Sequence, residues 1–91
     1  MKRTTSPSTA FQHLQKFLDK THGQIAIGEI PPISRAAYAA KGKKIRVALV
    51  AREGESVAEL LERLDTALGK AMAENIVIDE VVPEIQRMHP G

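Results

Sequence analysis

The sequence KIRVALVAREGESVAELLERLDTALGKAMAENIVIDEVV, residues 44–82, predicts a strand, a helix and a second strand in succession. Residues 44–51 alternate, with Ile45, Val47 and Leu49 on one face, as a strand does. Residues 76–82 are rich in β-branched side chains and are followed by Pro83, which ends a strand because it cannot donate to a ladder. We therefore expect a parallel β-α-β unit, in which the helix is the crossover between the two strands.

The helix between these strands carries the clearest local signals. Ser56 and Glu59 form the S-x-x-E pattern of a capping box, and Asn75 is a candidate left-handed terminator. Glu59 precedes Arg63 by four residues, the favourable order for an ion pair. We place Gly69 on the polar side of the helix. An apolar stripe at helical spacing is predicted to be the domain's own core or a dimer contact; it comprises Val57, Leu60, Leu61, Leu64, Leu68 and Met72.

The first half of the chain is harder to assign. Residues 1–7 are predicted to be a flexible basic tail, and a helix is expected to begin near Ser6 to Thr9 and to stop at Gly23. Residues 24–30 predict a short strand, bulged at Gly28 and ended by two prolines. The Ala-rich residues 33–42 predict two helical turns or, as an alternative, an ordered loop.

These elements predict a small single α+β domain over residues 8–83, with residues 84–91 as a partly ordered tail. It would have three short strands and two to three helices in the order α-β-α-β-α-β. A 91-residue chain without cysteine has no disulfide to stabilise it, so oligomerisation is the common remaining support. We expect a dimer that completes the small sheet or packs the leucine-rich helices together.

A second fold is suggested by residues 43–82. The segments KIRVALV and SVAELLERLDTAL resemble the strand and first helix of the ribbon-helix-helix family of repressors. The resemblance implies that Gly69 is the turn between two helices and that residues 70–82 form the second one. It also implies a dimer that places a two-stranded ribbon on duplex DNA.

Charge is divided unevenly along the chain. Residues 1–52 have a balance of +8 and residues 53–91 a balance of −6, with no acid between Glu29 and Glu53. Such a split favours a polyanionic partner for the first half, or complementarity between the halves or between subunits. An ordinary solvated rim is the alternative. Lys44, Arg46 and Ala48 are expected to share one strand face. The predicted basic surface for a macromolecule consists of Arg35, Lys41, Lys43, Lys44, Arg46 and Arg52.

Catalytic and metal-binding signals are weak. The three histidines stand apart in the sequence, and there is no cysteine, H-x-x-x-H or H-E-x-x-H. Asp79 and Glu80 would point to opposite faces of a strand. No glycine-rich phosphate loop is present. We predict no enzyme, no cofactor, no metal and no small-molecule substrate. Without a signal peptide or an apolar membrane span, we expect a cytoplasmic protein.

The function expected from these features is non-catalytic. We predict a regulatory or adaptor protein that recognises a macromolecule, DNA or an acidic protein, through its basic half and also self-associates. The acidic helix face of Glu55, Glu59, Glu62 and Asp65 could meet a basic partner or the basic half of a second copy. The alternative is a dimeric transcriptional regulator that binds duplex DNA through Lys43, Lys44 and Arg46.

Overall fold

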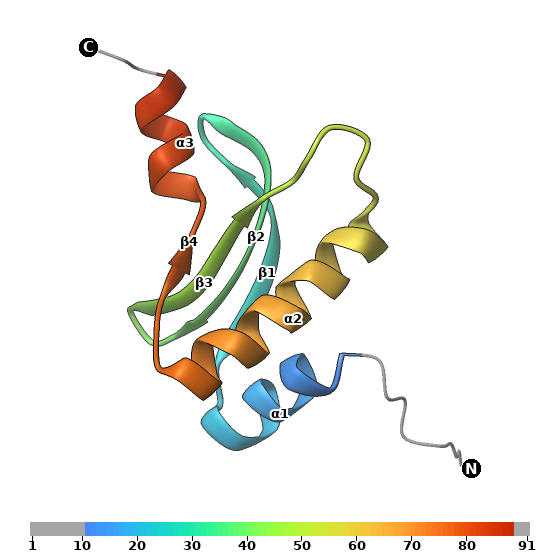
Figure 1. The fold of residues 1–91 in the computed structure, drawn as a ribbon, viewed down its shortest axis with the longest axis vertical. Coiled ribbons are helices and arrows are strands. Elements are labelled where there is room, and N and C mark those ends of the chain that lie inside the picture. Colours follow the sequence, from blue (N-terminus) through green and yellow to red (C-terminus); the bar gives the residue numbers. More distant parts are fainter. Residues whose placement is uncertain (1–10, 89–91) are drawn as a thin grey trace.

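The computed structural model describes residues 11–88, whose three helices pack on the two faces of one sheet (Figure 1). A four-stranded sheet has the order β1-β2-β3-β4; β1, β2 and β3 are antiparallel neighbours, and β4 is parallel to β3. Helices α1 and α2 cover one face of the sheet, and α3 lies on the other. In chain order the elements are α1 (Gln12–Thr21), β1 (Gln24–Ile30), β2 (Ile33–Lys41), β3 (Lys44–Val50), α2 (Val57–Glu74), β4 (Ile78–Asp79) and α3 (Val81–Met88).

The predicted limits and caps of α2 are confirmed. The helix spans Val57–Glu74, the Ser56–Glu59 capping box is formed in both directions, and Asn75 ends the helix in the left-handed conformation. Leu60, Leu64 and Leu68 are 0% exposed against α1 and the sheet. The stripe therefore forms the core of its own chain. Its two ends, Val57 and Met72, remain 44% and 40% exposed.

The parallel β3-α2-β4 unit is also present, but its last strand is shorter than expected. Strand β4 has two residues, and the chain then enters α3 where the sequence predicted the rest of a strand and a tail. The Asp79 carboxylate explains the change, because its Oδ1 accepts hydrogen bonds from the amides of Val81 and Val82 at 2.8 and 3.2 Å. Pro83 fits the first turn of this helix, where an amide has no helical partner.

The prediction of helix or loop for residues 33–42 was wrong, because Ile33–Lys41 is strand β2. This strand lies inside the sheet, between β1 and β3. Ala37 and Ala39 pack in the cluster beneath α1 and α2, whereas Ala36 packs in the cluster with α3. Small side chains suit a strand that is covered on both faces. Pairing on both edges thus overrides the helix propensity of alanine, and the sheet has four strands where three were expected.

The ribbon-helix-helix alternative was wrong as well. Helix α2 continues without a break through Gly69, and β3 pairs with β2 and β4 of the same chain. Gly69 was also misplaced on the polar side. A Cβ at this position would lie 2.7 Å from Nε2 of His13 in α1. The missing side chain at Gly69 therefore allows the two helices to approach.

Helix α1 begins at Gln12, and the predicted basic tail and helix start lie outside the described residues. Its N-cap, Phe11, makes no side-chain capping bond. A carboxylate from α2 takes this role instead, because Oδ1 of Asp65 accepts the Leu14 amide at 2.9 Å. At the other end His22, and not Gly23, adopts the left-handed conformation, with φ of 56°. Gly23 instead makes room for the ring of Phe17.

Candidate functional site at the β2–β3 hairpin

The six cations of the predicted basic surface do not form one patch. Strand β2 runs from Ile33 to Lys41 and β3 returns antiparallel to it, so the two ends of the hairpin are separated by the length of the strands (Figure 1). Arg35 lies at the open end, where its carbonyl accepts the amide of Ala51, the residue before Arg52. The remaining four lie at the turn: Lys41, Lys43, Lys44 and Arg46.

The turn itself brings like charges together. Lys41 and Lys44 are paired across β2 and β3, and the two residues between them are Gly42, with φ of 61°, and Lys43. Like charges directly opposite on neighbouring strands destabilise a sheet. Among residues 11–88, ion pairs are formed only by Arg63 and Arg87, so no carboxylate is paired with these lysines. The hairpin end is therefore an uncompensated basic surface.

Arg46 reaches the same surface because of a β-bulge. The register with β2 passes from Val47 to Ile45 and leaves Arg46 as the extra residue. Its Nη2 donates to Oδ1 of Asn75, the C-cap of α2, at 3.5 Å. The expectation that Arg46 shares the face of Ala48 and Lys44 was wrong for Ala48, which packs with α3 on the other face. A cation at this place also complements the negative end of the α2 dipole.

A small hollow opens between these cations and the two helices. Its volume is about 230 Å³, smaller than the roughly 300–1,000 Å³ of pockets that hold cofactors or drug-sized ligands. The wall contains Phe17 of α1, which was predicted as a core position, and Met72 of α2, which was predicted as core or a dimer contact. The lining comprises Phe17, Thr21, Lys41, Lys44, Arg46 and Met72. A space of this size, apolar inside and cationic at its rim, suits a protein side chain better than a cofactor.

The opposite end of the hairpin has different electrostatics. A hollow of about 390 Å³ is lined there by Arg35 and Arg52, but also by Glu53, Glu55 and Glu84. The backbone of Arg52 is held in its own loop, because its amide donates to Oε1 of Glu55 at 2.9 Å. Three carboxylates beside two cations disfavour a polyanion. We therefore exclude Arg35 and Arg52 from the candidate site.

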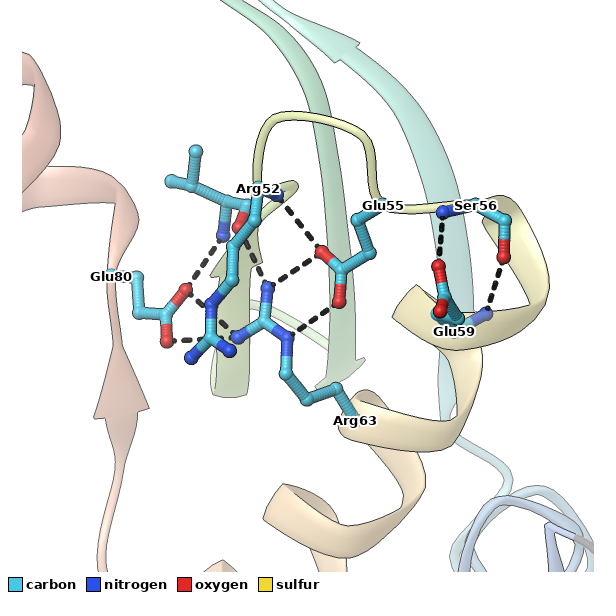
Figure 2. Close-up of polar contacts among 7 residues, drawn as sticks. Arg52, Glu55, Ser56, Glu59, Arg63 and Glu80 are labelled. Atoms are coloured by element: carbon cyan, nitrogen blue, oxygen red, sulfur yellow. Dashed lines mark hydrogen bonds and ion pairs between the residues drawn. The ribbon is translucent and has the colours of Figure 1, made fainter.

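Arg63 of α2 is the centre of the most extensive polar network in the described chain (Figure 2). Its guanidinium donates to both Glu55 carboxylate oxygens at 2.8 and 3.0 Å, to the Val50 carbonyl at 2.8 Å, and to Glu80 at 3.1 and 3.3 Å. Oε1 of Glu80 in turn accepts the Val50 amide at 3.0 Å. The predicted Glu59–Arg63 pair gives way to this network, since Glu59 turns back to the Ser56 amide.

This network joins the β3–α2 loop, α2 and the segment before α3, and its groups satisfy one another. Hydrogen bonds from Arg63, followed by that from the Arg52 amide, lower the pKa of Glu55 from 4.5 to about 2. The hydrogen bonds to Glu55 in turn raise the pKa of Arg63 above its ordinary value. The Glu55 side chain is only 9% exposed. We interpret the network as a structural clamp and not as a site for a ligand.

The network predicts how the free energy of unfolding changes at acidic pH. Because the pKa of Glu55 is lower in the folded chain, its contribution is complete above pH 4.5 and is lost as the pH falls toward about 2. We expect Glu55→Gln to lose stability at neutral pH and to show a shallower decline between pH 4.5 and 2 than the wild type. Urea midpoints measured at pH 7, 4.5 and 3 test this, and Arg63→Met should also lose less stability than the wild type as the pH falls. An equal loss of stability in the wild type and both variants would contradict the role given to the Glu55–Arg63 pair.

The predicted acidic face of α2 is largely occupied within the chain. Glu55 forms an ion pair with Arg63, Glu59 completes the capping box of α2, and Asp65 caps α1. Glu62 is the member of this group that makes none of these bonds. The face is therefore less suited to an electrostatic contact with a partner than the sequence indicated.

The described residues contain no group of three or more histidine, cysteine, aspartate or glutamate side chains that could hold a metal ion. None of their helices is long and apolar enough to cross a membrane.

No protein-family model, curated protein or solved structure matches this chain. The site must therefore be interpreted from its own chemistry.

Proposed function

We propose that this chain is a non-catalytic adaptor or regulatory protein whose hairpin end binds an acidic segment of a partner protein. The observation that carries the proposal is the hollow beside the β2–β3 turn, which combines the exposed Met72 side chain, with the buried Phe17 behind it, with the cations of Lys41, Lys44 and Arg46. A segment with an apolar side chain next to aspartate or glutamate would fill the hollow and neutralise its rim. Desolvated apolar contact would supply affinity, and charge would supply specificity and a fast association rate.

Duplex nucleic acid is the second candidate. It is favoured by the exposed turn, where Lys41, Lys43 and Lys44 are carried by a two-stranded hairpin that could contact phosphates. A phosphate backbone offers no apolar group for the hollow, so it would use the cations without Phe17 and Met72. For this reason the acidic protein segment ranks first.

Fluorescence anisotropy with three labelled peptides and one duplex separates these candidates. The first peptide alternates glutamate and leucine, the second has glutamine for glutamate, and the third has serine for leucine. We expect the first to bind at least tenfold more tightly than either of the others. Binding of the duplex that exceeds that of the first peptide, and falls about a hundredfold between 50 and 200 mM salt, would transfer the function to nucleic acid.

Matched variants locate the binding surface. Lys44→Gln combined with Arg46→Gln should weaken binding of the first peptide at least tenfold. Arg35→Gln combined with Arg52→Gln removes the same number of cations at the opposite end of the hairpin and should change the affinity less than threefold. Equal losses in both proteins would mean that only net charge matters and would overturn the proposed site.

A further inference from the structure

The two edges of the sheet differ in how their backbone groups are satisfied. At the β4 edge the strand is two residues long, and Glu80 extends the pairing to β3: its amide donates to the Ala48 carbonyl at 2.7 Å and its Oε1 accepts the Val50 amide. At the other edge β1 spans seven residues, and no strand of residues 11–88 pairs with its outer side. No strand of residues 11–88 pairs with the outer side of β4 either, so β1 is the longer of the two open edges of the described chain.

The first five residues of β1 lack the features that usually block edge pairing. Lysine, proline, inward-pointing charge and β-bulges are the common protections. Residues 24–28 have none of these, and the first charged residue, Glu29, coincides with the register shift between Gly28 and Ile30. The regular part of β1 is thus a neutral five-residue strand centred on Ala26.

The other routes to self-association that the sequence suggested are largely used up inside the chain. The leucines of α2 that were candidates for a helical dimer contact are buried against their own sheet. Asp65 and Glu55, candidates for a charge contact between copies, bind Leu14 and Arg63 of the same chain. Completion of the sheet is the route that remains for the dimer expected from the sequence.

We propose that two copies of this chain pair through β1, antiparallel about a twofold axis at Ala26, to form one continuous eight-stranded sheet. In this register Gln24 opposes Gly28 of the partner subunit, and Ile25 opposes Ile27 of the partner subunit. Both isoleucines are half-buried beside the α1–α2 core, so each cross-strand pair extends that core across the axis. The contact is isologous, so it closes after two copies and leaves no open edge at the junction.

Sedimentation equilibrium of the full chain tests the dimer, and charge variants test the axis. We expect a dimer mass at 200 µM protein. Ala26→Lys and Ala26→Glu each place like charges across the axis and should raise the dissociation constant at least tenfold. Mixing the two variants places Lys opposite Glu and should restore the dimer. A monomeric wild type, or an equimolar mixture as dissociated as each variant alone, would overturn the proposal.

Two further variants keep the result interpretable. Gln86→Lys and Gln86→Glu make the same charge changes on the exposed side of α3 and should leave the dimer intact. Where Ala26 variants fail to give the wild-type circular dichroism spectrum, Gln24→Lys combined with Gly28→Lys replaces them, because Gln24 is exposed and a side chain at Gly28 would meet nothing within 4 Å. In the proposed register these two lysines lie opposite each other at both ends of the contact, so a folded double variant that dimerises as tightly as the wild type would equally overturn pairing through β1.

Discussion

Leu64→Ala should lower the free energy of unfolding by about 3 kcal/mol, within the range of buried leucine truncations in well-packed cores. Leu64 is fully buried in the cluster that α1 and α2 form with the sheet, where Phe17, Val47 and Leu49 are equally inaccessible. The loss combines the transfer free energy of the removed methyl groups with the cavity left behind. For a domain of this size, such a loss is a large fraction of the total stability.

Urea denaturation followed by far-ultraviolet circular dichroism measures this loss, and Leu18→Ala is the matched control. Leu18 of α1 is 43% exposed, so the same truncation should cost less than about 1 kcal/mol. If Leu64→Ala left the unfolding free energy unchanged but weakened self-association, the stripe of α2 would be an interface and not the core.

Arg63→Met should lower the free energy of unfolding by about 2–3 kcal/mol, because it removes charge-assisted hydrogen bonds and leaves carboxylates without their partner. Glu55 is nearly buried and would lose both of its bonds to the guanidinium. Glu80 would lose the cation that orients it toward the Val50 amide. Methionine keeps most of the side-chain volume, so the effect reports the charge and not a cavity.

Arg87→Met is the control for this change. Arg87 pairs with Glu84 one turn earlier in α3, and its side chain is 76% exposed. Exposed ion pairs contribute little, so the expected change is within about 0.5 kcal/mol. Amide hydrogen exchange at Val50 gives a local readout, since Arg63→Met should accelerate it and Arg87→Met should not. Equal effects of the two variants would show that Arg63 acts as an ordinary surface cation.

Elements whose signals are local could be predicted from the sequence. The capping box at Ser56 and the terminator at Asn75 act within a few residues, and both appear in α2 as expected. The alternation of β3 and the irregularity near Gly28 in β1 are equally local. In these segments propensity, periodicity and tertiary packing favour the same structure.

Elements decided by distant contacts were predicted wrongly. Residues 33–41 are alanine-rich and favour a helix in isolation, but pairing with β1 and β3 makes them a strand. Residues 81–82 favour a strand, but the Asp79 carboxylate captures their amides and starts α3. Both cases involve short segments whose weak intrinsic preference is overridden by a few hydrogen bonds and buried contacts.

The candidate site could likewise be predicted only in part from the sequence. The basic residues around the β2–β3 turn could be named from charge alone, but their grouping could not. Antiparallel pairing separated Arg35 and Arg52 from the other four cations, and the bulge at Arg46 turned its side chain toward the end of α2. Phe17 had no sequence signal as a site residue, and Met72 was predicted only as core or a dimer contact, because an apolar side chain at helical spacing predicts a packed position.

The amino-acid sequence by itself determined a small α+β domain, the β3-α2-β4 unit, the limits of its central helix and the presence of a basic half. Only the tertiary structure decided that β2 is a strand, that α3 exists, and that three cations line a largely apolar hollow while β1 is left as an open edge. The physical reason is that capping and periodicity act over one or two turns of chain. The position of a strand in a sheet, and the surfaces that position exposes, depend on contacts between residues far apart in the sequence.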